Sequence, residues 1–491
     1  MTMFNLQIDA VVPMLCVTLG ALAAMAGEAL RGKGPRMPVG WFGIIGLVGA
    51  AVSAVVLWNP TPEAFREDFG VIVADNFGLF VTLVLALVGI LTVMFSSQVI
   101  HRDNIPAGEY YALVLFSIVG MMMMATATDL LVIFVALEIL SLAVYVLTGI
   151  RRDNQAGTEA AFKYFLLGAI SSAFFLYGIA FTYGVTHSTR LSAIAQYLSA
   201  QSMSGDAMVL IALGLLLVGF AFKISAVPFH MWTPDAYEGA PAIVTGFMST
   251  GVKAAAFAAF ARVFLSSFEP FRDLSAAGPG WAPVVAVIAA ATMILGTVVG
   301  VAQANLKRML AYSSIAHGGY LLVGLVAANS VGKAAILFYL LAYSVTNLAA
   351  FGVIAMLGAR DRANDSLRDY AGLWQSSPGL AALMTVCLLS LGGLPPTAGF
   401  IGKWYIFQAA VSAGYYWLAI IGVLTSVVSV FFYLRVVVMM YMADRVGAPE
   451  PPRVSGFGMV ALALSIVVIF YLGILPTPVL DFAGQSIGTI F

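Results

Sequence analysis

Five charged residues lie inside stretches of the sequence that are otherwise apolar. One is an acid, Glu138, within LVIFVALEILSLAVY, and the others are Lys163, Lys223, Lys253 and Lys403. A lysine that is removed from water can lose its proton and a buried carboxyl group can keep its proton, whereas an arginine stays charged. An ionisable residue in an apolar stretch is a candidate for function because it is costly to bury. One acid and several amines are the residue types that a proton relay needs.

Four of these residues, Glu138, Lys223, Lys253 and Lys403, are our main candidates for such a relay. Glu138 and Lys223 also have a structural interpretation, as members of an ion pair that only fastens helices together, and Lys253 and Lys403 have one as lysines whose side chains reach to the membrane surface. We expect Glu138 to have a lysine partner on a neighbouring helix, because an unpaired buried carboxylate costs several kcal/mol.

Two residues are secondary candidates. Lys163 stands near the start of its apolar stretch and close to Glu159, so a side chain that reaches up to the membrane surface explains it equally well. His317 lies in the middle of an apolar stretch, within SSIAHGGY. An imidazole exchanges protons near neutral pH, but a neutral, hydrogen-bonded histidine explains this position equally well.

Two of the lysines stand beside proline clusters that interrupt apolar stretches. Residues 227–241, just after Lys223, read VPFHMWTPDAYEGAP, and residues 393–407, which include Lys403, read GLPPTAGFIGKWYIF. A proline inside a helix removes a hydrogen bond and clashes with the preceding turn, so these stretches predict broken helices. In transporters, broken helices lie at the ion-binding sites near the middle of the membrane.

The composition defines the class of protein that holds these residues. The chain is 61% hydrophobic and 9% charged, whereas about 25% charged residues are usual in soluble domains, so we predict an all-α polytopic membrane protein. The formal net charge of zero gives no basic field for nucleic acid. Cys16 and Cys387 stand far apart in apolar stretches, and no CxxC or phosphate-binding loop occurs. We therefore expect no metal, cofactor or nucleotide site in this chain.

Stretches that are long enough to cross a bilayer recur along the whole chain. We predict about fourteen transmembrane helices, because each crossing needs roughly 20 apolar residues. The predicted crossings are 11–30, 38–58, 77–97, 109–127, 129–149, 159–184, 207–227, 241–265, 282–302, 308–328, 332–358, 378–413 with an interruption, 417–441 and 457–476.

The remaining Lys and Arg residues predict the orientation, because cytoplasmic loops are rich in them. With the N-terminus outside, the basic residues on the cytoplasmic side are Arg31, Lys33, Arg36, Arg102, Arg151, Arg152, Lys307, Arg308, Arg360, Arg362, Arg368, Arg435, Arg445 and Arg453. Those on the outer side are Arg66, Arg190, Arg262, Arg272 and Lys333. The excess on one side predicts that both termini lie outside. Because every Lys and Arg except Lys163, Lys223, Lys253 and Lys403 is assigned to a membrane face, we also expect no arginine to be buried within a crossing.

The two interruptions are separated by an odd number of crossings, which predicts two five-helix repeats of opposite orientation. The predicted divisions are 1–108 with three helices, 109–267 as the first repeat with its break near 223–234, 282–441 as the second repeat with its break near 392–403, and 442–491 with the last helix.

The two proline-containing motifs, 227–241 and 393–407, resemble those of the antiporter-like membrane subunits of respiratory complex I, the bacterial NADH–quinone oxidoreductase. The resemblance extends over essentially the whole chain. Within this family, a lysine at position 403 and the lack of a long lateral C-terminal helix resemble the subunit N branch. The resemblance implies that Glu138, Lys223, Lys253 and Lys403 are the family's functional acid and lysines.

The resemblance further implies a non-redox subunit of a proton-pumping enzyme in the bacterial inner membrane, with periplasmic termini. NADH, FMN, iron–sulfur clusters and quinone would be handled by partner subunits. The expected partners are other membrane subunits and the lipid bilayer.

The predicted function is therefore proton translocation. Glu138 and Lys223 would form a coupled acid–base pair, and the proton would pass to Lys253 and then to Lys403. One alternative is a subunit of a multi-subunit sodium/proton antiporter, which has no link to NADH. The other is a structural membrane spacer whose charges only hold helices together.

Overall fold

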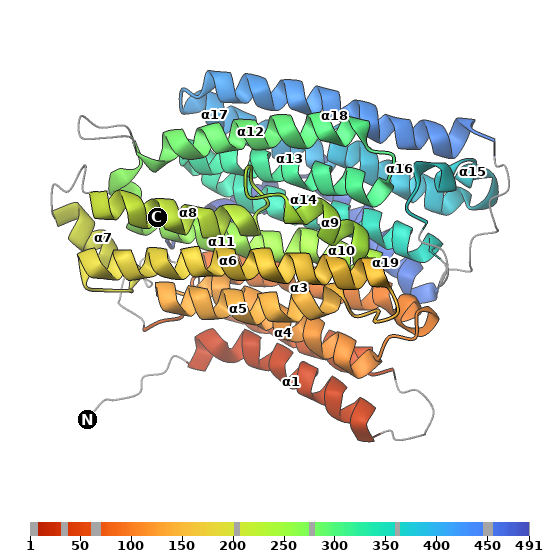
Figure 1. Ribbon diagram of the computed structural model, residues 1–491, viewed down its shortest axis with the longest axis horizontal. Helices are drawn as coiled ribbons and strands as arrows, with labels where there is room; N and C mark the ends of the chain where they lie inside the picture. The colour runs from red at the N-terminus through yellow and green to blue at the C-terminus, as the bar shows by residue number, and fades with distance from the viewer. Residues whose placement is uncertain are drawn as a thin grey trace.

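Long apolar helices that run side by side make up the protein (Figure 1). The computed structural model describes residues 8–30, 38–59, 70–200, 207–273, 280–358, 364–444 and 455–490. Within these ranges the only β-type pairings are three isolated bridges between connecting segments. The predicted all-α membrane class is confirmed.

Eleven helices of the described residues are long and apolar enough to cross a membrane. They are α1 (Ile8–Leu30), α3 (Asn76–Arg102), α4 (Ala107–Thr126), α5 (Leu130–Thr148), α6 (Gln155–Thr186), the continuous helix formed by α10 (Ala242–Phe247), η2 (Met248–Val252), α11 (Lys253–Arg262) and η3 (Val263–Ser267), α12 (Trp281–Ala302), α13 (Leu306–Ala327), α14 (Ser330–Leu357), α18 (Tyr416–Met442) and α19 (Gly456–Ile474). Three apolar helices are shorter, namely α2 (Gly40–Val56), α8 (Ala207–Lys223) and α16 (Pro378–Gly392).

The chain leaves the helical path at both predicted proline clusters. Helix α8 ends at Lys223, and α9 (Trp232–Gly239) follows after an irregular segment. Helix α16 ends at Gly392, and α17 (Ala398–Ser412) carries the chain onward. Gly393, directly after α16, has φ +80°, a left-handed conformation that glycine adopts without a steric penalty.

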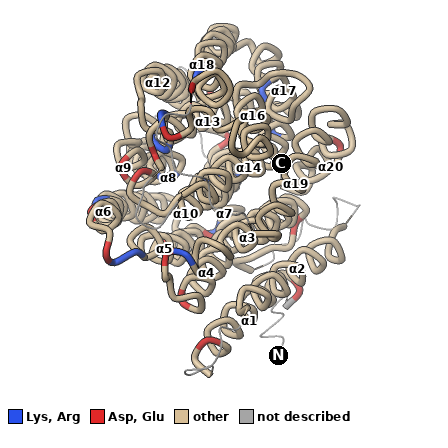
Figure 2. The backbone as a smooth tube through the Cα atoms, turned by 90° about the vertical axis from the view of Figure 1, so that its right-hand side faces the viewer, with Lys and Arg blue, Asp and Glu red and all other residues tan. Residues whose placement is uncertain are grey.

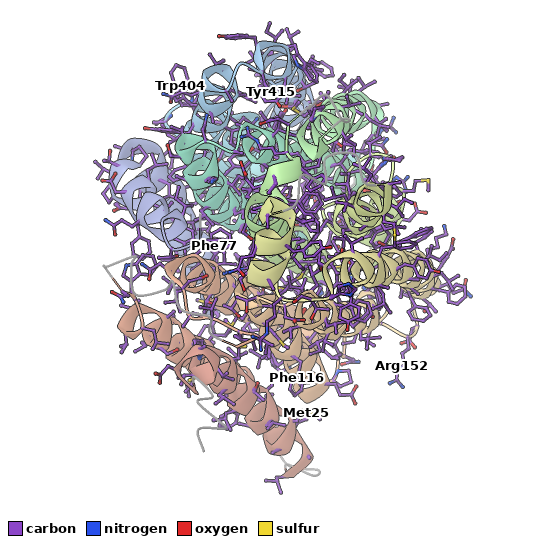
Figure 3. The ribbon with its side chains drawn as sticks, turned by 90° about the vertical axis from the view of Figure 1, so that its left-hand side faces the viewer. Met25, Phe77, Phe116, Arg152, Trp404 and Tyr415 are labelled. Atoms are coloured by element: carbon purple, nitrogen blue, oxygen red, sulfur yellow. The ribbon has the colours of Figure 1, made fainter. Side chains whose placement is uncertain are left out.

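The helices form a central group and an outer group. Figure 2, which looks along the helices, shows α3, α10 and α14 in the interior, with α1 and α2 at one edge and α12 and α18 at the other. Figure 3 shows Met25 of α1 and Trp404 of α17 at these opposite edges. The outer faces carry exposed apolar side chains, as expected for contact with lipid.

Helices α1 and α2 cross closely because glycines face each other. A Cβ atom on Gly20 would lie 2.8 Å from the Phe42 carbonyl oxygen, and one on Gly46 would lie 2.7 Å from the Cys16 carbonyl oxygen. Small residues that allow two backbones to approach are typical of helix pairs in membranes.

Besides α9, three short α-helices were not predicted. They are α7 (Leu191–Ala200), α15 (Leu373–Ser376) and α20 (Thr477–Ile487). Each is too short to produce the long apolar signal used for the crossings. In Figure 1, α7 and α15 lie at opposite ends of the long helices, where the chain turns back.

The expectation that no arginine is buried within a crossing is wrong. Arg262 lies in the helix Ala242–Ser267 and is 3% exposed. It is neutralised by Asp75, which is 187 positions away in the sequence, so no local pattern revealed the pair. Arg435 also lies within a crossing helix, and it donates to the carbonyl oxygens of Val301 and Gln303 at the end of α12.

Several residues used for the orientation lie outside the described part of the chain. These are Arg31, Lys33, Arg36, Arg66, Arg360, Arg362, Arg445 and Arg453.

Candidate functional site

Lys253 is buried in the middle of the protein. It is the first residue of α11 and follows a π-helical turn, a helix irregularity that is frequent at functional sites. Its side-chain nitrogen donates to the carbonyl oxygen of Ser314 at 2.5 Å and to the hydroxyl oxygen of Ser314 at 2.7 Å. The residue is 2% exposed. Its ammonium group is therefore held by α13 through neutral oxygens.

His317 lies one turn further along α13 and connects to two other helices. Its Nδ1 is 2.5 Å from the hydroxyl of Tyr339 on α14, and its Nε2 is 3.2 Å from the hydroxyl of Tyr433 on α18. The Tyr433 hydroxyl is also hydrogen bonded to Ser313. Both ring nitrogens thus have partners, and four side chains form one buried hydrogen-bonded row.

Lys403 lies at the second helix break. Its side-chain nitrogen donates to the carbonyl oxygens of Leu391 at 2.9 Å and Gly392 at 3.1 Å, the last two residues of α16, and to the hydroxyl of Ser426 at 2.9 Å. The C-terminal end of a helix carries partial negative charge and attracts cations. The break therefore creates the binding site for this buried amine, which is 4% exposed.

Lys223 lies at the first helix break but has a different environment. It is 3% exposed, and its side-chain nitrogen has no hydrogen-bond partner within the described residues. The nitrogen lies 5.4 Å from the ring centre of Tyr145 and 5.5 Å from that of Tyr164. Aromatic faces attract a cation without accepting a conventional hydrogen bond.

Glu138 is half-buried on α5, and its carboxylate accepts a hydrogen bond from the hydroxyl of Ser172 on α6 at 2.5 Å. No ion pair joins Glu138 to Lys223 or to another lysine of the described chain, so the expected lysine partner is not in direct contact, although Glu138 and Lys223 interact electrostatically. The sequence predicted that Glu138 and Lys223 lie in apolar helices, but it could not give the distance between them. The Ser172 hydroxyl makes the hydrogen bond to Glu138 that was expected from a lysine.

Lys163 lies apart from the buried lysines. Its side chain is 46% exposed, and its nitrogen pairs with Glu159 at 2.8 Å and with Asp235 of α9 at 3.0 Å. Arg308 pairs with the same Asp235 at 2.9 Å and with Glu238 at 2.7 Å. These surface ion pairs tie α9 to α6 and α13.

A cavity of about 330 Å³ opens beside this network. Its charged lining residues are Arg102, Asp103, Arg151, Glu238, Lys307 and Asp365. Lys307 contacts Asp365 at 3.3 Å and donates to the carbonyl oxygens of Glu238 and Ala240. The cavity therefore reaches the start of α10, the helix that continues to Lys253.

The structure thus brings Lys253, His317 and Lys403 to the surroundings of α13, and Glu138 and Lys223 to the surroundings of α5 and α6. Tyrosine residues were missed in the sequence, although they lie around the buried amines and His317. They are Tyr145, Tyr164, Tyr320, Tyr339, Tyr343 and Tyr433. Helical spacing from a charged residue, as from Glu138 to Tyr145, was an available signal.

No group of three metal-binding side chains occurs in the ranges that the structure describes.

Comparisons with known proteins define the class. Residues 127–429 match the family described as NADH:quinone oxidoreductase/Mrp antiporter, transmembrane. The solved Mrp complex from Dietzia sp. DQ12-45-1b contains a chain with the same fold, at a TM-score of 0.85 and 22% identity, covering 99% of this chain and 98% of the other.

Closer similarity comes from full-length relatives. NADH-quinone oxidoreductase subunit N of Trichlorobacter lovleyi is 44% identical over 99% of this chain and 98% of its own length, and subunit N 1 of Solibacter usitatus is 41% identical over 96% of each. A chain of respiratory complex I from Thermus thermophilus is 35% identical with a TM-score of 0.79, covering 96% of this chain and 98% of that one. The chain belongs to the NADH-quinone oxidoreductase subunit N family.

Proposed function

We propose that this chain is the proton-translocating membrane subunit N of an NADH–quinone oxidoreductase. Its similarity to subunit N relatives over nearly the whole length supports its place in that complex. Oxidation of NADH and reduction of quinone take place in partner subunits, which hold FMN and iron–sulfur clusters. This chain uses the energy of that reaction to move protons.

The main support for the proposal is the environment of three buried lysines. Three lysines, Lys223, Lys253 and Lys403, are 2–4% exposed, and none is paired with a carboxylate in the described part of the chain. Breaking a buried ion pair leaves an uncompensated charge, which is strongly unfavourable. An amine that is held by hydroxyls, carbonyls and aromatic faces can release its proton without leaving such a charge behind.

The proposed path runs from the Glu138 side of the protein to the Lys403 side. The proton enters the pair of Glu138 and Lys223, moves to Lys253, and reaches Lys403. His317 is close enough to both Lys403 and Lys253 to interact with them electrostatically, so the His317 row offers a route between the last two. Water near the two helix breaks completes the connections.

We also propose the finer membrane topology. If the three shorter helices cross the membrane together with the residues that follow their breaks or ends, the chain has the fourteen crossings that the sequence predicted. The helices from α4 to η3 and from α12 to α18 would then be two repeats of opposite orientation, matching the divisions 109–267 and 282–441. The chain would lie in the bacterial inner membrane with periplasmic termini, in contact with lipid and with other membrane subunits.

Vesicles that contain the assembled complex provide the test. Lys223→Ala and Glu138→Gln are expected to keep NADH oxidation by the assembled complex but to lower the number of protons moved per NADH. Arg152→Ala is the matched control, because Arg152 is exposed on the connection between α5 and α6. Normal proton transport in both site variants would contradict the proposal.

The second candidate function is that of a sodium/proton antiporter subunit, which the shared fold with the Mrp chain favours. An antiporter moves protons when a sodium gradient is imposed, without NADH. Purification from native membranes distinguishes the two functions, because an accompanying flavin and iron–sulfur assembly supports the oxidoreductase.

A further inference from the structure

The region between Glu138 and Lys223 is occupied by Tyr145. Tyr145 is seven residues after Glu138 on α5, which is about two turns, so the two side chains share one face of the helix. The tyrosine residue is 7% exposed, and the Lys223 nitrogen lies 5.4 Å from its ring centre. One side chain thus lies next to the lysine and on the same helical face as the acid.

Three buried polar atoms meet here without hydrogen-bond partners in the described structure. They are the nitrogen of Lys223 and the hydroxyl oxygens of Tyr145 and Tyr164. The two tyrosine rings are in edge-to-face contact, with centres 4.6 Å apart. Buried polar groups in proteins almost always have partners, so a cluster of three that lack them indicates a site whose hydrogen bonds form in another state or through water.

The Tyr145 hydroxyl packs against helix α6 at Gly168. Gly168 lies four residues after Tyr164 and four residues before Ser172, so the three share one face of α6. A Cβ atom on Gly168 would lie 1.9 Å from the Tyr145 hydroxyl oxygen, so a side chain here would displace that hydroxyl. The hydroxyl therefore rests against α6 at a level between Ser172, which binds Glu138, and Tyr164, which lies beside Lys223.

We propose that the Tyr145 hydroxyl relays the proton between Glu138 and Lys223, an inference that rests on the function proposed above. In the relay step, the carboxylic acid proton of Glu138 moves to the Tyr145 oxygen while the hydroxyl proton of Tyr145 moves to the neutral amine of Lys223. Tyr145 is neutral before and after the step. Glu138 ends as a carboxylate and Lys223 as an ammonium ion, so charge and protons balance.

A relay hydroxyl explains why the acid and the lysine do not touch. A direct ion pair would hold the proton on the lysine, because separating two buried opposite charges is costly. A hydroxyl between them transfers the proton and then separates the charges by the length of a tyrosine side chain. The ring of Tyr145 also faces the ammonium ion that the step produces.

The test compares Tyr145→Phe with Tyr110→Phe in the complete complex reconstituted into vesicles. Phenylalanine keeps the ring and removes only the hydroxyl. Tyr110 on α4 is a matched control, because its hydroxyl is also buried without a partner and lies away from the buried lysines. We expect Tyr145→Phe to lower NADH-linked proton transport roughly tenfold or more, as loss of a proton-transfer group does, and Tyr110→Phe to leave it unchanged.

The outcomes separate this inference from the proposed function. If Lys223→Ala and Glu138→Gln abolish transport while Tyr145→Phe transports normally, the relay is overturned and Tyr145 only packs. If Lys223→Ala itself transports normally, the proposed function fails first.

Two further variants keep the test decisive if Tyr145→Phe does not assemble. A fluorinated tyrosine incorporated at position 145 keeps the shape but makes the phenol more acidic, so the pH profile of transport should shift. An unchanged profile would overturn the relay. Gly168→Ala should impair assembly or transport because its methyl group displaces the hydroxyl, and the added change Tyr145→Phe should relieve part of that defect. Equal defects in Gly168→Ala and in the double variant would contradict the proposed contact between Gly168 and the Tyr145 hydroxyl.

Discussion

Arg262 and Asp75 form a buried bidentate ion pair that joins the helix of Lys253 to the start of α3. The guanidinium nitrogens lie 2.6 and 2.8 Å from the two carboxylate oxygens. Asp75 also caps α3 by accepting from the backbone nitrogen of Gly78, and Arg262 donates to the carbonyl oxygen of Ala125 at the end of α4. Figure 3 labels Phe77, whose ring lies 5.3 Å from the guanidinium carbon of Arg262. Three helices are thus tied together at one end of the protein.

Arg262→Gln should destabilise the protein strongly, because Asp75 would remain buried without its cation. Removing one partner of a buried pair typically costs about 3–5 kcal/mol. The measurement is the thermal unfolding temperature of the purified complex, together with the amount of this chain that assembles. Arg262→Lys keeps the charge but loses the bidentate hydrogen bonding, so its loss of stability should be intermediate. A stable Arg262→Gln variant would show that the pair contributes little.

Lys403→Arg separates the structural role of this position from its proton chemistry. An arginine can still donate to the carbonyl oxygens of Leu391 and Gly392, but it does not release its proton. We expect this variant to assemble and to lose NADH-linked proton transport in vesicles by roughly tenfold or more. Lys403→Ala should lose both assembly yield and transport. Normal transport in Lys403→Arg would mean that the side chain only binds the end of α16.

His317→Ala and Tyr433→Phe should not have additive effects. The two side chains share a hydrogen bond of 3.2 Å, so each change removes the same link. Groups in one hydrogen-bonded network commonly show interaction energies of about 0.5–3 kcal/mol. A double-mutant cycle on the unfolding free energy, or on the transport rate, measures this coupling. Fully additive effects would mean that the row does not act as a unit.

Lys163→Ala should leave proton transport close to that of the unchanged protein. Its side chain and those of Glu159 and Asp235 are all substantially exposed, and exposed ion pairs contribute little. Arg308→Ala should have a larger effect on assembly, because Arg308 pairs with both Asp235 and Glu238. A transport defect in Lys163→Ala with normal assembly would instead place this lysine in the relay.

Asp365 predicts a pH effect on stability. Burial raises the pKa of its carboxyl group above the ordinary value, although nearby Lys307 acts in the opposite direction. A raised pKa in the folded state contributes stability at low pH, and this contribution is lost as the pH rises through the folded-state pKa. The stability of Asp365→Asn relative to the unchanged protein should therefore increase as the pH rises through the acidic range. Unfolding temperatures of the purified complex over a pH series measure this, and the opposite trend would contradict it.

The sequence was sufficient to predict the long helices and both breaks. Long apolar stretches have no other stable arrangement in a bilayer than helices. The proline clusters around Pro228 and Pro395 interrupt their helices through local steric effects, which do not depend on the tertiary structure. The buried positions of Lys223, Lys253 and Lys403 followed from the same patterns.

The partners of the charged residues were not predictable in the same way. Ser172 binds Glu138 between two consecutive helices, and Asp75 binds Arg262 from a helix far away in the sequence. Helical periodicity contains no information about contacts between helices. The tyrosines were missed for a different reason. Their rings count as apolar in a search for crossings, while their hydroxyls, as in Tyr433, provide the polar contacts of the interior.

The row through His317 has a direction as well as a set of contacts. A neutral imidazole donates from one nitrogen and accepts at the other, so Tyr339 and Tyr433 must play opposite roles at any moment. When a proton enters at one end and another leaves at the far end, every hydrogen bond in the row reverses. The donors and acceptors in the row then stay reversed. The row can pass a second proton in the same direction only after its side chains have rotated back to their original orientation. In the proposed relay, each transfer would therefore have two stages, passage and reset, and the slower stage would limit how quickly protons move from Lys253 to Lys403.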